Sequence, residues 1–149
     1  MKMSAEYIEA QKNMQPGVIS SVGFLGDDKR DLVQIIDEDE QIMSQLGLDF
    51  EKVAMWMKKL LDLAVKGLGE NVLVDDKWEV NVYEARGFIP CPFKDGIFRK
   101  RVIRVKNTHN KTQIDLSELS IHLFEKHHFL QGKGSPFRID PYVLKKVLE

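Results

Sequence analysis

The sequence predicts a single α+β domain over residues 1–149, with a helical N-terminal half packed on a small, mostly antiparallel sheet and two C-terminal helices. Three observations predict this class. Apolar residues recur at the helical period over 50–66, they alternate at the strand period over 71–86, and no repeat or linker divides the chain. A chain of 149 residues with 43% hydrophobic content is long enough to bury one core.

The first part of the chain is expected to hold two helices and a strand. Residues 4–14 form a short helix, and residues 18–26 form a strand. The second helix begins at Asp27 or Asp28, because a carboxylate there accepts hydrogen bonds from free backbone N–H groups. Gly47 ends it.

The clearest element is the helix over 50–66, for which Asp49 is the expected N-cap. Together with the second helix it forms an αα-hairpin. Its apolar stripe predicts that it packs on the core, and the stripe consists of Phe50, Val53, Ala54, Met57, Leu60, Leu61 and Ala64. The same helix carries Met55 and Trp56, which make a protein–protein interaction surface one alternative function.

The sheet is predicted from a change of hydrophobic period after this helix. Residues 71–75 and 78–86 form a hairpin, and residues 97–107 form a third strand after a turn at 94–96. The segment 87–93 cannot be an interior strand, because its two prolines lack the N–H group that a ladder requires.

The last part of the chain is expected to be a polar loop followed by two helices. The loop covers 108–113, and the first helix opens with Asp115 and Glu118 at capping-box spacing. The second begins at Asp140-Pro141, where an N-cap residue precedes a proline at the first helical position.

The charges are divided unevenly along the chain. Residues 1–85 carry 9 Lys and Arg against 17 Asp and Glu, whereas residues 86–149 carry 13 against 6, so that a net charge of −1 conceals a split of −8 and +7. Two interpretations stay open. The basic half presents a face to an anionic partner, or the two halves pack with complementary charge.

Composition also suggests a compartment. The only cysteine is Cys91, so no intrachain disulfide forms, and the N-terminus lacks the apolar stretch of a secretory signal. No run approaches the roughly 20 apolar residues of a membrane span. We therefore expect a cytoplasmic protein without a membrane partner.

The sequence contains no strong catalytic or metal-binding motif. Cys91 is the one candidate nucleophile, and a small enzyme that pairs it with a nearby histidine is an alternative function. Ligands on a helix usually lie three or four residues apart. His122 and His127 are five apart, about 140° around a helix, so we expect them to diverge. The sequence predicts no metal and no cofactor.

The segment "HHFLQGKGSPFR" at 127–138 is the candidate anion-binding site. Its glycines expose backbone N–H groups, and cationic side chains flank them. The predicted anion-binding residues are Arg86, His127, His128, Gly132, Lys133, Gly134, Ser135 and Arg138.

These patterns favour a non-enzymatic binding or regulatory module over an enzyme. Its basic half would contact a phosphorylated ligand, a nucleic acid or an acidic protein. A protein partner or a homo-oligomer is compatible with the same sequence.

Overall fold

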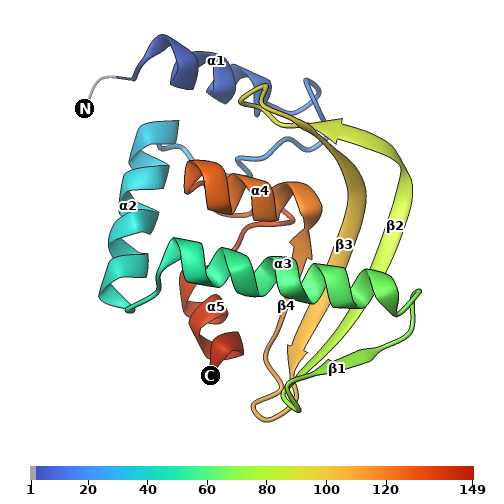
Figure 1. Ribbon diagram of the computed structural model, residues 1–149. Helices are drawn as coiled ribbons and strands as arrows, with labels where there is room; N and C mark the ends of the chain where they lie inside the picture. Colours follow the sequence, from blue (N-terminus) through green and yellow to red (C-terminus); the bar gives the residue numbers. More distant parts are fainter. Residues whose placement is uncertain (1–2) are drawn as a thin grey trace.

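The computed structural model describes residues 3–149. Within this range five helices and a four-stranded antiparallel sheet form one α+β domain, as predicted (Figure 1). The helices are α1 (Ala5–Asn13), α2 (Leu32–Gln45), α3 (Phe50–Lys66), α4 (Glu118–His127) and α5 (Pro141–Leu148). The strands are β1 (Val72–Val74), β2 (Trp78–Pro90), β3 (Ile97–Asn107) and β4 (Gln113–Ser117).

The sheet is a meander in the order β1-β2-β3-β4. Its central hairpin, β2–β3, is much longer than the two outer strands. β1 pairs with β2 only as far as Val80, and β4 pairs with β3 only as far as Val102. The outer end of the hairpin therefore extends beyond both neighbours and curves toward α1 (Figure 1).

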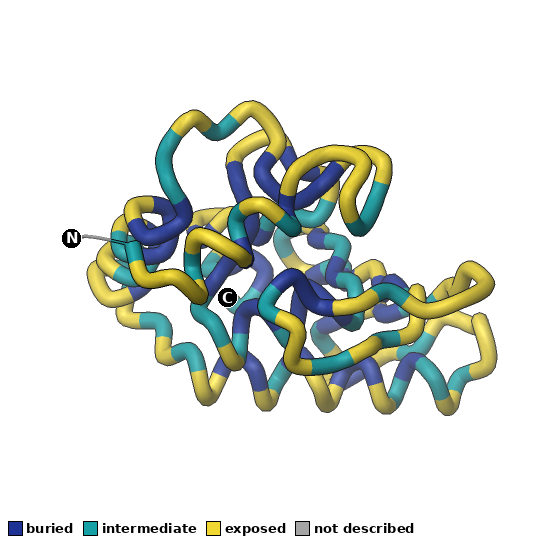
Figure 2. The backbone as a smooth tube through the Cα atoms, turned by 90° about the horizontal axis from the view of Figure 1, so that it is seen from above, coloured by how far each residue is buried: buried dark blue, intermediate teal, exposed yellow. Residues whose placement is uncertain are grey.

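The main core lies between the sheet and the helices α3, α4 and α5. Strand alternation points Trp78, Val80 and Ile103 into this core, where they are at most 8% exposed. The indole N–H of Trp78 donates to the carbonyl of Val147 over 2.8 Å and so fixes α5. Figure 2 shows the matching alternation along α3, whose buried turns face the interior.

A second apolar cluster lies under α1, α2 and the start of α4. It contains Met14, Leu32, Leu123 and Phe129 together with Cys91, which comes from the segment that joins β2 to β3. This cluster brings the outer end of the hairpin against α4.

Several sequence predictions are confirmed. The structure places α3, β3 and α5 at the predicted positions, with Asp49 and Asp140 as N-caps of the two helices. The hairpin of β1 and β2 turns at the predicted residues. However, β2 continues to Pro90 instead of ending at residue 86, and residues 88–90 pair with β3 alone, so this part of the strand is not interior to the sheet.

The prediction of a strand over 18–26 is wrong. This segment consists of turns and bends, and Gly23 and Gly26 have positive φ angles of 69° and 56°. Close contacts with other backbone segments explain the irregular conformation. A Cβ at Gly23 would lie 2.4 Å from the Met14 carbonyl oxygen, and one at Gly26 would lie 2.4 Å from the backbone nitrogen of Ser135. The segment follows its neighbours rather than a ladder.

Two helix starts also differ from the prediction. Asp31, not Asp27 or Asp28, caps α2 in a capping box with Gln34. Residues 113–117 form β4 instead of belonging to a loop and a helix start, so Ser117 caps α4. Asp115 lies within this strand and pairs with Arg104.

Part of the charge split is satisfied inside the molecule. Within residues 3–149, five ion pairs join acidic residues of the first half to basic residues of the second. Three are Asp39 with Arg138 at 2.7 Å, Glu40 with His128 at 2.6 Å and Glu9 with Lys94 at 3.1 Å, and Glu84 pairs with both Arg101 at 3.0 Å and Arg99 at 3.4 Å. The structure thus supports charge complementarity between the two halves. Across residues 3–149, every helix is too short or too polar to span a bilayer.

Candidate metal centre

The turn between β2 and β3 holds two potential ligands, Cys91 and Asp95. The backbone N–H of Cys91 donates to Gly96, and that of Lys94 donates to the Cys91 carbonyl, both over 2.9 Å. Lys94 adopts a positive φ of 60°, which tightens the turn. The side chain of Asn13 from α1 donates to the Pro92 carbonyl over 2.9 Å, so the turn is also anchored from outside.

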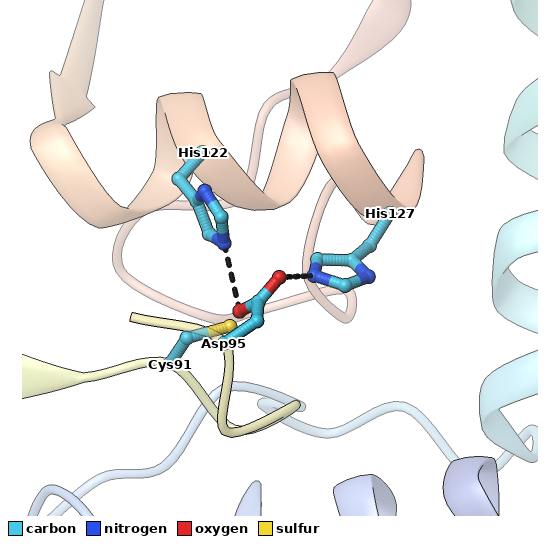
Figure 3. A group of neighbouring side chains, drawn as sticks. All are labelled: Cys91, Asp95, His122 and His127. Atoms are coloured by element: carbon cyan, nitrogen blue, oxygen red, sulfur yellow. Dashed lines mark hydrogen bonds and ion pairs between the residues drawn. The ribbon is translucent and has the colours of Figure 1, made fainter. Parts of the chain in front are cut away.

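Helix α4 supplies the other two potential ligands, His122 and His127. The expectation that these rings diverge is wrong. Nε2 of His122 lies 2.9 Å from Oδ1 of Asp95, and Nε2 of His127 lies 2.7 Å from Oδ2 of the same carboxylate. Both rings point from α4 toward the turn, and the Asp95 carboxylate lies between them (Figure 3).

The four side chains form one compact group, which we call the Cys91 cluster: Cys91, Asp95, His122 and His127 (Figure 3). One donor atom from each residue lies within 4.8 Å of the others. Such a set of one sulfur, one oxygen and two nitrogens is of the kind that zinc accepts in tetrahedral sites.

Aromatic rings hold both histidines in place. Phe93 stacks on His127 with ring centroids 3.9 Å apart and an interplanar angle of 6°. Phe98 packs on His122 at 4.4 Å. The histidine side chains are only 14% and 15% exposed, and Cys91 is 1% exposed, whereas Asp95 is 39% exposed and forms the open side of the cluster. The ligand geometry is therefore largely set by packing.

Electrostatics fix the protonation states of the cluster. Burial opposes ionisation of Asp95, but hydrogen bonds from Cys91, His122 and His127 hold its pKa well below the usual range. Burial, reinforced by the Asp95 carboxylate, raises the pKa of Cys91 to about 12. Burial also lowers the pKa of His127. In the metal-free protein the thiol is consequently protonated and the carboxylate ionised.

The protonated thiol of Cys91 disfavours the alternative of a Cys–His enzyme. A nucleophilic cysteine needs a lowered pKa and an adjacent cation or base that takes its proton. Cys91 has a raised pKa, and its neighbour Asp95 is an anion that disfavours the thiolate. A bound cation reverses this balance, because a coordinating thiol gives up its proton.

The predicted anion-binding loop is occupied by the protein's own carboxylates. The backbone N–H of Lys133 donates to Oδ2 of Asp28 over 3.1 Å. A Cβ at Gly134 would lie 3.1 Å from Oδ2 of Asp27, and one at Gly132 would lie 2.1 Å from the Leu25 carbonyl oxygen. The two glycines thus allow the loop to pack closely on residues 24–28.

The cationic side chains of that prediction are dispersed. Arg138 binds Asp39 and the Gln131 carbonyl, and His128 binds Glu40 while it stacks on Phe50 at 3.9 Å. His127 belongs to the Cys91 cluster.

The remaining two residues of the predicted anion site are also apart from one another. Ser135 is buried and donates to Oε1 of Gln131 over 2.6 Å. Arg86 is exposed on β2, within the irregularity between Glu84 and Phe88. The structure therefore does not assemble the eight predicted residues into one site, and anion binding by them stays a prediction.

The interaction surface considered on α3 is small. Met55 is 62% exposed. Trp56 instead packs edge-on against Trp78 with ring centroids 5.3 Å apart. An exposed apolar patch over both residues is thus not formed.

Comparison with protein-family models, with curated proteins and with solved structures gives no match to this chain. The molecule is therefore defined by its α+β fold and by the Cys91 cluster at the outer end of its central hairpin.

Proposed function

We propose that the protein is a zinc-binding domain in which the Cys91 cluster holds one metal ion. The ligands would be Sγ of Cys91, one carboxylate oxygen of Asp95 and Nε2 of both His122 and His127. The observation that carries this proposal is the convergence of these four donors, from a turn and a helix about 30 residues apart in sequence, within 4.8 Å of one another. Diverging histidines would exclude a shared ion, but Nε2 of His122 and of His127 both lie within 2.9 Å of the Asp95 carboxylate.

Zinc coordination requires a modest contraction of the cluster. With Zn–N and Zn–O distances of about 2.0–2.2 Å and Zn–S of about 2.3 Å, neighbouring ligand atoms on a tetrahedron are about 3.3–3.6 Å apart. The Asp95 carboxylate lies between the two rings and would turn so that one of its oxygens faces the ion. Because Asp95 is the most exposed ligand, it can turn without moving the core.

Binding also requires proton rearrangement. An ionised Asp95 only accepts hydrogen bonds, so Nε2 of each histidine carries the proton in the metal-free protein. Each ring would shift this proton to Nδ1, which frees the Nε2 lone pair for the metal. The Cys91 thiol would lose its proton to solvent, since only thiolate sulfur is an effective ligand.

A site with four protein ligands leaves no open position for substrate, which favours a structural ion over a catalytic one. The ion would join the β2–β3 turn to α4 and so fix the outer end of the hairpin. This proposal agrees with a non-enzymatic binding module, in which the metal stabilises the scaffold.

Cobalt substitution tests the proposal. Metal-free protein titrated with Co²⁺ should bind one equivalent and develop a thiolate-to-cobalt charge-transfer band, together with the intense visible bands of tetrahedral cobalt. Zinc should displace the cobalt, with a dissociation constant below about 10⁻⁷ M, which corresponds to the lower end of structural zinc affinities. Cys91→Ser should abolish the charge-transfer band.

His122→Ala should weaken zinc binding strongly, whereas His109→Ala, a change at an exposed loop histidine outside the cluster, should leave it unchanged. Cobalt spectra without a sulfur band in the wild-type protein, or equal zinc affinity in both histidine variants, would overturn the proposal.

A further inference from the structure

A cavity of about 340 Å³ lies between β3, the segment 20–24 and the segment 131–137, so the predicted anion loop forms part of its wall through Ser135. It lies where β3 pairs with β2 alone, because the β3–β4 pairing ends at Val102 and Ser117. Its volume is at the lower end of the range for small-molecule sites, roughly 300–1,000 Å³.

The cavity has an apolar body. Val22 and Phe24 line it from one side, Ile89 and Leu119 from the hairpin and α4, and Phe137 from the C-terminal segment. Val22 is 56% exposed although it is apolar, so a ligand in the cavity would remove its surface from water.

One end of the cavity is basic. Arg99, Lys100 and Arg101 on β3 line it. Glu84 bonds to Arg101 over 3.0 Å and to Arg99 over 3.4 Å, and Glu118 lies 3.9 Å from Arg101. The Arg99 side chain is 52% exposed and is held only by its 3.4 Å contact with Glu84, so it is free to turn toward a ligand.

A buried polar side chain, Gln131, also lines the cavity. The residue is 2% exposed and has a positive φ of 70°, an uncommon conformation for a non-glycine residue that the surrounding structure must hold in place. Its Oε1 accepts from Ser135, but none of the described residues accepts from its side-chain amide nitrogen. Among the described residues, this amide nitrogen is a donor without a protein partner on the wall of the cavity.

We propose that this cavity binds a small organic acid, with the apolar chain between Phe24, Ile89 and Phe137 and the carboxylate received by Arg99 and the Gln131 amide. This goes beyond zinc binding and does not depend on it, since neither the cavity's charges nor its apolar walls include a residue of the Cys91 cluster. It also assigns the anionic partner expected of the basic half to a cavity rather than to the occupied glycine loop.

Octanoate and octanol form a matched pair of probes for this proposal, because they share a chain and differ in the head group. Titration of ¹⁵N-labelled protein with octanoate should shift amide NMR signals at residues 20–24, 99–102 and 131–137 selectively. Octanol should bind at least about fivefold more weakly, since the anion gains a charged hydrogen bond at a partly exposed site.

Two arginines of the same strand provide matched variants. Arg99→Gln should weaken octanoate binding by about fivefold to tenfold without changing the affinity for octanol. Arg104 is 54% exposed and also has an acidic partner, Asp115, but it does not line the cavity, so Arg104→Gln should leave both affinities unchanged.

The proposal is overturned if 10 mM octanoate, roughly the top of the useful range for weak ligands, shifts no signals at the cavity. It is equally overturned if octanoate and octanol bind alike and Arg99→Gln changes neither, since the cavity would then be an apolar surface without an anion site. Zinc content measured on the same sample separates this outcome from a failure of the metal proposal.

Discussion

Replacing Arg138 by methionine removes one half of a buried ion pair. The guanidinium contacts both oxygens of Asp39, at 2.7 and 3.0 Å, and donates to the Gln131 carbonyl over 2.7 Å. The Asp39 side chain is 1% exposed and that of Arg138 is 12% exposed. Without the arginine, the carboxylate stays buried in a place that water does not reach.

The size of the effect follows from this burial. Breaking a buried ion pair by removing one partner costs about 3–5 kcal/mol, because a charge is left without compensation. At about 2–4 °C per kcal/mol for a chain of this length, the melting temperature should fall by about 6–20 °C. The double variant Asp39→Leu with Arg138→Met should recover most of the loss, since no charge stays buried.

Urea unfolding, followed by tryptophan fluorescence and circular dichroism, measures the loss in the free energy of unfolding directly. Arg104→Met is the matched control, because Arg104 also binds both oxygens of a carboxylate, that of Asp115, but is 54% exposed. Its removal should cost less than about 1 kcal/mol. If Arg138→Met costs no more than the control and instead weakens phosphate binding at 132–135, then Arg138 serves the predicted anion site and the structural role inferred here is refuted.

Two further changes test how the loop 132–135 is held. The pKa of Asp28 is lowered mainly by hydrogen bonds from Arg30. The ionised Asp28 therefore stabilises the folded protein above its unfolded pKa of 3.8, and this stabilisation is lost as the pH falls below that value. Asp28→Asn should therefore cost about 2 kcal/mol at pH 7 in chemical denaturation, with the gap to wild type closing in acid, whereas Asp76→Asn at an exposed turn should cost little. Gly26→Ala should cost about 3 kcal/mol or more in the same assay, since its Cβ would lie 2.4 Å from the backbone of Lys133, while Gly47→Ala, with a positive φ but open space around it, should cost about 1 kcal/mol. If Gly26→Ala and Gly47→Ala lowered the free energy of unfolding equally, the close backbone contact at Gly26 would not contribute to stability.

Elements that depend on local pattern were predictable from the sequence. The helix α3 follows from its apolar stripe and its Asp49 cap, and β3 follows from alternation after an Asp-Gly turn. Their boundaries are set by residues within or next to the element. The same holds for α5, where a cap and a proline are adjacent.

Elements that depend on distant neighbours were not predictable in this way. Residues 18–26 alternate like a strand, yet close contacts of Gly23 with α1 and of Gly26 with the loop near Ser135 keep them irregular. Strand β4 is polar in its first residue and acquires its conformation from pairing with β3 between Val102 and Lys106. Neither partner is apparent from the segment itself.

The Cys91 cluster was missed for a related reason. A rule for ligand pairs on one helix considers only the helix, and from a spacing of five residues it predicts that His122 and His127 diverge. It omits a third element, the turn that carries Asp95 between them. The available signal was the combination of Cys91 and Asp95, four apart in a Pro- and Gly-containing turn, with two histidines on the helix that packs against it.

X-ray absorption at the zinc edge tests the central claim most directly, because it counts the ligand atoms by type. On protein loaded with one equivalent of zinc, we expect one sulfur at about 2.3 Å and three nitrogen or oxygen atoms at about 2.0–2.1 Å, with the outer-shell pattern of two imidazoles. Cys91→Ser should remove the sulfur contribution. A six-coordinate shell of oxygen and nitrogen without sulfur in the wild-type protein would contradict the assignment of Cys91, Asp95, His122 and His127 as a zinc site.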